Sequence, residues 1–159
     1  MTLTAKVLTV SDGVVAGTRD DISGRTLVER LAAEGYEVVA HEVTADGIAE
    51  VADALRRLST DFAGLVVTTG GTGFGPRDLT PEGTREVIER EAPGLAEAMR
   101  HLSLGVNHHG MLSRSVCGAV GAALVCNLPG SSRGAIECLE AVLPALPHAL
   151  DLLAGGRPH

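Results

Sequence analysis

A repeated alternation of short apolar runs and amphipathic stretches limits what this chain can fold into. Residues 6–10 and 64–68 are predominantly apolar runs with the length of a buried strand. Between them, residues 46–59 carry apolar side chains every three or four positions, which is the spacing of a helix with one buried face. Because a strand followed by a crossover helix returns as a parallel neighbour, this order predicts an α/β fold. We expect a three-layer α/β/α sandwich with a mostly parallel sheet.

One region departs from the parallel pattern. Residues 112–116 and 123–127 predict two strands separated by a glycine-containing segment, with Gly118 and Gly121 between or beside them. Strands joined by so short a connection must run in opposite directions. We therefore expect a short antiparallel strand pair in the second half of the chain.

Capping residues mark where several helices begin and end. Thr80 followed by Pro81 predicts a helix with Thr80 as N-cap and proline in its first turn. Ser131, or the serine after it, predicts the N-cap of the last helix. Pro144 and Pro147 lie inside the apolar stripe of that helix, so we expect a kink or break there.

Length and composition predict one domain. The chain has 159 residues and 45% apolar residues but only 2% aromatic residues, so its core must be mainly aliphatic. On folding, a chain of this size buries about two thirds of the surface that its unfolded form exposes, so it needs no disulfide or bound metal to stabilise a core. We expect a single domain over residues 1–154 and a flexible tail over residues 155–159.

Polar side chains follow each predicted parallel strand. Ser11 and Asp12 follow the first strand, Asp46 follows the second, residues 69–78 follow the third and residues 129–131 follow the last. In open α/β sheets, ligands bind outside the carboxyl ends of the strands. The sequence therefore predicts that these four loops meet and form the ligand site.

The loop after the third strand is the most informative segment. Four glycines within residues 70–75 and two neighbouring threonines allow successive backbone N–H groups to point into one concavity, which binds anions without a lysine. The pattern matches neither the P-loop nor the dinucleotide fingerprint. A turn that needs glycine only for its dihedral angles is the alternative. The residues that we expect to contact an anion are Thr69, Gly70, Gly71, Thr72 and Gly73.

Two acids are expected close to this loop, because Asp46 follows the second predicted strand and Asp78 is the last residue of the loop. Asp46 and Asp78 would supply the hard oxygen ligands that Mg²⁺ bound to a polyphosphate prefers. Each acid also has a structural alternative, because Asp46 could cap the following helix and Asp78 could close an Asx turn. Arg77 and Arg133 could bind phosphates as fork-shaped donors or form surface ion pairs.

Charge and cysteine content exclude several classes of function. The net charge is −7, which argues against non-specific binding to nucleic acid or to an anionic membrane. Lys6 is the only lysine and lies in a predicted strand, so P-loop and Schiff-base lysines are missing. Three cysteines without a paired spacing predict reduced, buried thiols and no zinc site. We expect a cytoplasmic protein with no membrane span.

Several segments together resemble one family. Residues 68–73 and 77–82 (TTGGTG and RDLTPE) are similar to the molybdenum-cofactor biosynthesis proteins of the MogA/MoaB family. Residues 11–12, 21–24 and 112–114 also match the family pattern, as does the segment Asn127–Ser131. The resemblance covers about residues 5–153.

The resemblance implies a fold, an activity and an assembly. Family members have a three-layer α/β fold and form homotrimers, in some members paired into hexamers. The implied reaction is Mg-ATP-dependent adenylylation of molybdopterin, which yields adenylyl-molybdopterin and pyrophosphate. By position, Asp46 and Asp78 correspond to the catalytic acids of the family, which bind the Mg²⁺ that accompanies ATP. The implied substrate-binding residues are Ser11, Asp12, Thr69, Gly70, Gly71, Thr72, Gly73, Ser113, Arg114, Pro129, Gly130 and Ser131.

The chain departs from the family pattern at two places. Ser132 stands where family members often have proline, although the following Arg133 keeps the basic charge. Residues 119–122 lack the basic residue that the hairpin usually carries. These departures leave open a molybdopterin-binding protein of the MoaB type with little or no catalysis. A nucleotide-binding α/β domain with another substrate is a third interpretation.

Overall fold

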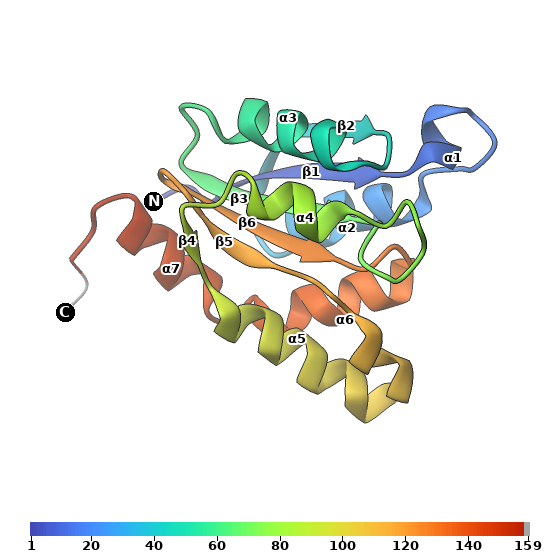
Figure 1. Cartoon of the computed structure of the whole chain (residues 1–159). Helices are drawn as coiled ribbons and strands as arrows, with labels where there is room; N and C mark the ends of the chain where they lie inside the picture. The colour runs from blue at the N-terminus through green and yellow to red at the C-terminus, as the bar shows by residue number, and fades with distance from the viewer. Residues whose placement is uncertain (158–159) are drawn as a thin grey trace.

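The computed structural model describes residues 1–157 and contains one six-stranded sheet (Figure 1). The strand order across the sheet is β2-β1-β3-β6-β5-β4. The four strands that run parallel to one another are β1 (Thr4–Val10), β2 (Glu37–Thr44), β3 (Gly64–Thr69) and β6 (Ala123–Leu128). The antiparallel edge is formed by β5 (Cys117–Val120) and β4 (Arg90–Glu91). The mostly parallel sheet and the antiparallel pair are both confirmed.

Helices cover both faces of the sheet (Figure 1). On one face lie α2 (Ile22–Ala33), α5 (Pro93–Val106), α6 (Ser132–Val142) and α7 (Leu146–Leu153). On the other face lie α3 (Ile48–Ser59) and α4 (Thr80–Arg85). Two short segments complete the chain: α1 (Asp12–Val15) and the 3₁₀ helix η1 (His108–Leu112). The three-layer α/β/α sandwich is confirmed.

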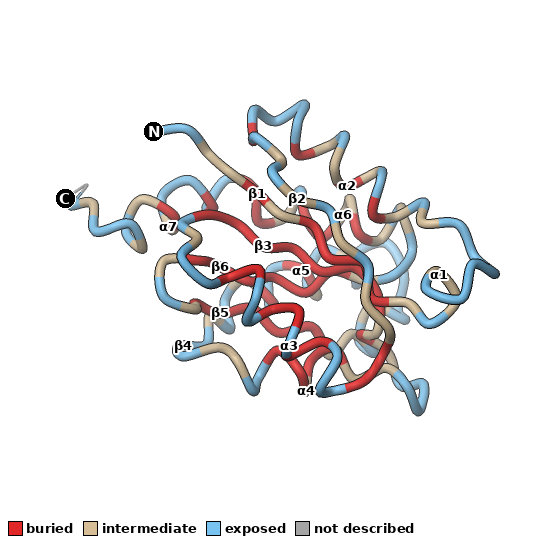
Figure 2. Tube along the Cα trace, turned by 90° about the horizontal axis from the view of Figure 1, so that it is seen from above, coloured by how far each residue is buried: buried red, intermediate tan, exposed pale blue. Residues whose placement is uncertain are grey.

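The sheet separates two aliphatic cores. Strands β3 and β6 are buried along their whole length, which explains why their sequences are mostly apolar and do not alternate with exposed polar residues (Figure 2). Leu27 and Leu139 contribute to the core under α2 and α6, and Leu55 contributes to the core under α3. The three cysteines are buried and unpaired, as predicted. A contact with Cys117 raises the pKa of the Cys126 thiol, and burial raises it further.

Two local predictions were wrong. The strand expected at 112–116 begins instead at Cys117, because the N–H of Val116 donates to the side chain of Asn127 and not to a neighbouring strand. Thr80 is not an N-cap, because it is the first residue of α4 and its hydroxyl donates to the carbonyl of Gly70 (2.9 Å). The N-cap role of Ser131 is confirmed by its bond from the N–H of Gly134 (3.1 Å).

The C-terminal region matches its prediction in part. The last helical segment breaks between Val142 and Leu146, as the prolines predict. Gly155 and Gly156 donate backbone hydrogen bonds back to α7. Pro158 and His159 lie outside the described residues, so the flexible tail stays a prediction. Within residues 1–157, no helix has the length and apolarity needed to cross a membrane.

Asn127 joins four segments at the centre of the fold. Its side chain is fully buried, accepts from the N–H of Val116 (3.1 Å) and donates to the hydroxyls of Thr68 (3.1 Å) and Thr84 (2.9 Å). These partners belong to the segment before β5, to β3 and to α4. Because all three bonds are buried, removing the amide leaves the Val116 N–H and the Thr68 hydroxyl without partners, whereas the Thr84 hydroxyl keeps its bond to the Thr80 carbonyl (2.8 Å).

We predict that Asn127→Ala lowers the free energy of unfolding by about 3 kcal/mol, because buried polar groups that lose their partners cost about 1–3 kcal/mol each. Urea denaturation monitored by circular dichroism measures the change. Asn107→Ala is the matched control, since Asn107 is exposed and only caps η1. Equal effects of the two substitutions would contradict the central role of Asn127.

Candidate functional site

The four loops predicted to meet do line one cleft at the carboxyl edge of the parallel strands. Its volume is about 720 Å³, and it lies above the ends of β1, β3 and β6. Of the predicted site residues, those that line it are Ser11, Asp46, Thr69, Gly70, Gly71, Thr72, Gly73, Asp78, Gly130 and Ser131. Asp12, Ser113, Arg114 and Pro129 lie beside the cleft instead.

The glycines of the loop after β3 are required by backbone geometry and by close contacts. Gly70 (φ 106°) and Gly71 (φ 69°) adopt the left-handed region. A Cβ on Gly70 would lie 2.2 Å from the carbonyl oxygen of Val10, and one on Gly71 would lie 2.2 Å from the Thr80 hydroxyl. Any other residue at these two positions would push the loop away from β1 and α4.

This loop also presents unused hydrogen-bond donors. The N–H groups of Gly71, Thr72 and Gly73 donate to no acceptor within residues 1–157, whereas the N–H of Gly70 donates to Leu128 (3.2 Å). All three residues with free N–H groups line the cleft. The loop therefore has the donors of an anion-binding nest, in addition to the dihedral role that the alternative interpretation assigned to its glycines.

Asp46 is held at the end of β2 and does not cap α3. The helix begins after Gly47, and no side chain caps it. Asp46 Oδ2 accepts the N–H of Asp12 (2.9 Å), while Oδ1 has no hydrogen-bond partner among the described residues. Burial raises the pKa of the Asp46 carboxyl, and the negative charges of Asp12 and Asp78 raise it further. Asp46 is thus a buried acid with one oxygen available to a ligand.

Asp78 has a comparable arrangement on the opposite loop. Its Oδ2 accepts the N–H of Gly75 (2.8 Å), three residues earlier, which closes the glycine-rich loop. The Asx turn of the alternative interpretation is not formed, because the N–H of Thr80 donates to the carbonyl of Gly71 (3.1 Å). A Cβ on Gly75 would lie 2.7 Å from the same oxygen, so glycine is needed for this closure. Oδ1 makes no hydrogen bond within the described part of the chain. Asp78 therefore shapes the loop and still offers an oxygen to the cleft.

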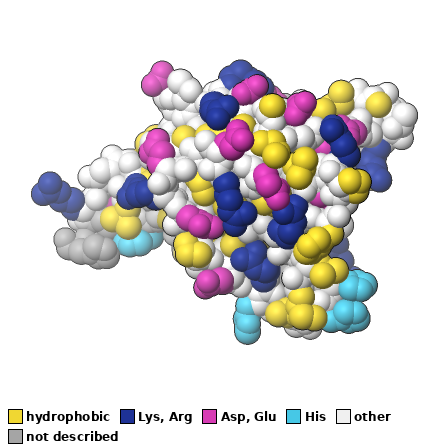
Figure 3. Space-filling model, in the orientation of Figure 1, with side chains coloured by type: hydrophobic (Ala, Val, Ile, Leu, Met, Phe, Trp, Pro, Cys, Tyr) yellow, Lys and Arg dark blue, Asp and Glu magenta, His cyan; other side chains and the backbone are white. Residues whose placement is uncertain are grey.

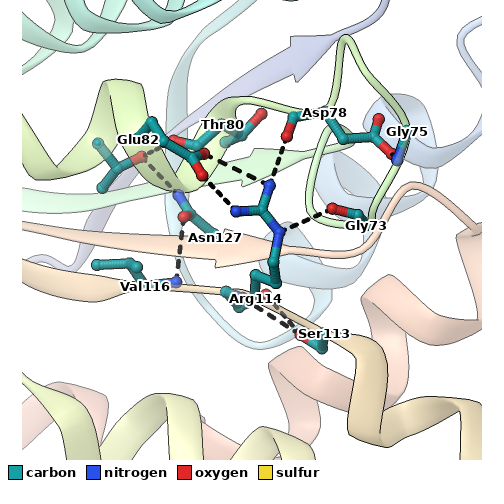
Figure 4. A network of polar contacts seen from close by, with 11 residues as sticks. Gly73, Gly75, Asp78, Thr80, Glu82, Ser113, Arg114, Val116 and Asn127 are labelled. Atoms are coloured by element: carbon teal, nitrogen blue, oxygen red, sulfur yellow. Dashed lines mark hydrogen bonds and ion pairs between the residues drawn. The ribbon is translucent and has the colours of Figure 1, made fainter.

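Arg114 supports the loop from below (Figure 4). Its Nε donates to the carbonyl of Gly73 (2.9 Å), its Nη2 donates to the carbonyl of Asp78 (2.5 Å), and its Nη1 pairs with Glu82. The ring of Phe74 lies 5.5 Å from the guanidinium carbon. With its donors engaged in this way, Arg114 holds the glycine-rich loop and Asp78 in place.

Ser113 and Pro129 line a second pocket of about 390 Å³. This pocket adjoins the main cleft, because Thr72, Gly73 and Ser131 line both. The carbonyl of Pro129 accepts the hydroxyl proton of Thr69 (2.8 Å), which joins the loops after β3 and β6. The two pockets together could bind a ligand with two parts, one of them anionic.

Most arginines near the cleft are already paired. Arg77 pairs with Asp12, and Arg133 pairs with Glu137 at the surface, as the ion-pair alternative predicted. Arg19 differs, because it lines the cleft and its side chain has no polar partner within residues 1–157. Sequence reasoning missed Arg19, and its place in the long polar loop after β1 was the signal that could have identified it.

Thr9 and Asp21 form another part of the cleft wall. Asp21 caps α2 by accepting the N–H of Gly24 (3.0 Å), and it also lines the cleft. The hydroxyl of Thr9 donates to Asp21 (2.8 Å), and Nε2 of His41 lies 2.8 Å from the same carboxylate. Both carboxylate oxygens of Asp21 therefore already have partners in the protein, unlike those of Asp46 and Asp78.

The carboxylates fit a cation that arrives with its own ligands. No group of three or more His, Cys, Asp or Glu residues within the described range could hold a metal ion. Asp46 and Asp78 each have one unbonded carboxylate oxygen on the cleft. Mg²⁺ typically uses one or two carboxylates together with water and phosphate oxygens. The donor set therefore fits Mg²⁺ bound to a polyphosphate better than a cation held by the protein alone.

The fold and the cleft define an α/β protein with a cleft at the carboxyl edge of a parallel sheet, where ligands bind in such folds. A family model described as a probable molybdopterin binding domain matches residues 6–148. The chain belongs to this family, which confirms the resemblance found in its sequence.

Individual relatives agree with this assignment. The chain is 38% identical over 152 residues to the molybdopterin adenylyltransferase of Helicobacter pylori (strain J99), a match that spans 94% of the chain and 86% of that protein. It is 46% identical to the molybdopterin biosynthesis enzyme MoaB of Thermus thermophilus, with a TM-score of 0.90 and coverage of 97% and 98%. It is 35% identical to the molybdopterin biosynthesis Mog protein of Mycobacterium ulcerans, with a TM-score of 0.89 and coverage of 98% and 99%.

We predict that Arg19→Gln raises the dissociation constant for Mg-ATP about three- to tenfold, because Arg19 is an unpaired cation on an otherwise acidic cleft. Isothermal titration calorimetry measures the constant. Arg57→Gln is the control, since Arg57 pairs with Glu42 and does not line the cleft. An unchanged affinity of the Arg19 variant would show that this arginine does not contact the nucleotide.

Proposed function

We propose that this protein adenylylates molybdopterin with Mg-ATP as the co-substrate. The observation that carries the proposal is the pairing of Asp46 and Asp78, each with an unbonded oxygen, beside the three free N–H groups of residues 71–73. Such donors and acceptors neutralise and orient phosphates without a covalent nucleophile. The similarity to the adenylyltransferase of Helicobacter pylori supports the same activity.

In the proposed reaction, a phosphate oxygen of molybdopterin attacks the α-phosphorus of ATP. A new P–O bond forms, the bond between the α- and β-phosphates breaks, and pyrophosphate leaves with the electron pair. Mg²⁺, when bound, neutralises phosphate charge and polarises the reacting phosphate. Asp46 and Asp78 are the residues that would hold it.

The loops supply the other interactions in this proposal. The N–H groups of Gly71 and Gly73 and the hydroxyl of Thr72 orient phosphate oxygens. Ser131, at the N-terminus of α6, adds a helix end that favours negative charge. The adjoining pocket is lined partly by apolar side chains, Val106 and Leu112 among them, and we assign it to the less polar part of a substrate.

The second candidate function is molybdopterin binding of the MoaB type with little or no catalysis. The hairpin between β5 and β6 turns at Gly121 (φ 55°) and lacks the basic residue of the family pattern, which is the departure that favours this function. The intact pair of Asp46 and Asp78 favours the enzyme.

We predict that Asp78→Asn and Asp46→Asn each lower the rate of adenylyl transfer at least about 100-fold, because each removes a charge that would bind Mg²⁺. The dissociation constant for molybdopterin should stay within about threefold, since the carboxylates contact the metal-bound nucleotide. Chromatographic detection of adenylyl-molybdopterin and fluorescence titration measure the two quantities.

Asp53→Asn is the control for this experiment, because Asp53 is an exposed acid on α3 that pairs only with Arg56. Wild-type protein that binds molybdopterin but forms no adenylyl product, with and without Mg²⁺, would reject the enzyme in favour of the MoaB-type function. Wild-type protein that binds ATP but not molybdopterin would indicate a nucleotide-binding domain with another substrate.

We also propose that the protein is a cytoplasmic homotrimer, or a hexamer of two trimers, as the family resemblance implies. Exposed apolar side chains gather where α5 ends and η1 follows, and Figure 3 shows them next to histidines at the lower end of that face. The residues concerned are Leu104, Val106, Met111 and Leu112. Three unpaired thiols are typical of a reducing compartment.

We predict that the mass measured by light scattering is about three or six times that of the 16.3 kDa chain. Met111→Glu should reduce the assembly, because a charge would replace an exposed apolar side chain on this face. Val39→Glu is the control, since Val39 is exposed on the edge strand β2. A wild-type monomer would contradict the proposed assembly.

A further inference from the structure

Two aspartates that follow neighbouring strands bind each other's backbone. The N–H of Asp12 donates to Oδ2 of Asp46 (2.9 Å), and the N–H of Asp46 donates to Oδ1 of Asp12 (3.1 Å). This pair of hydrogen bonds joins the loop after β1 to the loop after β2. Because one oxygen of Asp46 is held in this way, the direction of its carboxylate is set by Asp12.

Arg77 adds the third loop to this arrangement. Its Nε and Nη2 donate to the two carboxylate oxygens of Asp12 (3.0 and 3.2 Å). The same Nη2 donates to the backbone carbonyl of Asp46 (2.7 Å). One guanidinium therefore contacts both aspartates and connects them to the glycine-rich loop. Planar fork geometry makes arginine suited to such a contact, and lysine could not reproduce it.

The position of these residues separates them from the ligand. Asp46 lines the cleft and is buried, whereas Asp12 and Arg77 are exposed and do not line it. Asp12, Asp46 and Asp78 bring three negative charges to one end of the cleft, and Arg77 forms an ion pair with Asp12 and a hydrogen bond to the backbone carbonyl of Asp46. Nε and Nη2 of Arg77 both donate to oxygens of the protein. Arg77 therefore holds the two aspartates in place and does not use these groups to bind a ligand.

We propose that Asp12 and Arg77 are positioning residues that hold Asp46 in the orientation needed to bind Mg-ATP. This inference rests on the proposed adenylyltransferase function and assigns Asp12 a role different from the substrate contact implied by the family resemblance. Residues that orient a metal-binding carboxylate typically affect metal affinity or activity about 10- to 100-fold. Asp12 and Arg77 act through Asp46 and do not contact molybdopterin.

The test compares Arg77→Gln with the control Arg56→Gln. Arg56 is similarly exposed and ion-paired, but it lies on α3 away from the cleft. We expect Arg77→Gln to lower kcat about tenfold and to raise the Mg²⁺ concentration for half-maximal rate about tenfold. The KM for molybdopterin should stay within about twofold. Amide hydrogen exchange of Asp12 and Asp46, followed by NMR, should become at least about tenfold faster.

The outcomes distinguish this inference from the proposed function. Absence of turnover in the wild-type protein would contradict the proposed function, and the exchange rates would still test the contact. With an active wild type, an unchanged kcat and unchanged amide exchange in the Arg77 variant would overturn the inference. A raised KM for molybdopterin with normal amide exchange would also overturn it, because Arg77 would then bind substrate directly.

A double-mutant cycle with Asp12→Asn tests whether Arg77 acts through Asp12. Asparagine keeps an oxygen for the N–H of Asp46 but loses the charge that pairs with Arg77. We expect the double variant to be no slower than Arg77→Gln alone, since the two residues share one contact. Fully additive losses would overturn the inference. If Arg77→Gln does not fold, Asp12→Asn replaces it. The same four quantities are then measured: kcat, the Mg²⁺ concentration for half-maximal rate, the KM for molybdopterin and the amide exchange rates.

Discussion

The close approach of the Gly70 backbone to the end of β1 is the constraint on which the cleft depends. A side chain at this position would collide with the Val10 carbonyl, so only glycine lets the chain leave β3 at this angle. The loop then passes over the sheet edge with the N–H groups of residues 71–73 unpaired and returns to α4 at Thr80. The site is thus a consequence of how closely two parallel strands end beside each other.

Local contacts, and not the net charge of −7, determine which charged groups in the cleft are available to a ligand. Asp46 and Asp78 each use one carboxylate oxygen to fix a loop and leave the other unbonded. Arg77 and Arg114 hold loops through backbone carbonyls and carboxylates, which leaves Arg19 as the unpaired cation on the cleft within residues 1–157. An acidic protein can handle phosphates in this way because backbone dipoles and placed cations act over short distances.

Much of the fold could be predicted because its signals are local. The apolar runs of β1 and β3, the serine at the start of α6 and the prolines after Val142 each depend on residues close in sequence. The errors arose where a hydrogen bond to a residue distant in the sequence changed a local preference. Asn127 takes the N–H of Val116, and Gly70 takes the hydroxyl of Thr80, so neither segment adopts the structure that its own residues favour.

By itself, the sequence determined the order of strands and helices, the glycine-rich loop, and the presence of Asp46 after β2 and of Asp78 at the end of that loop. Those features follow from periodicity, capping and the topology of parallel sheets. Only the tertiary structure decided which arginines are paired, that Asp12 and Asp46 bind each other's backbone and that Arg114 lies below the loop. Hydrogen-bond partners between loops depend on distances between residues far apart in the chain, and a single sequence carries no direct signal for those distances.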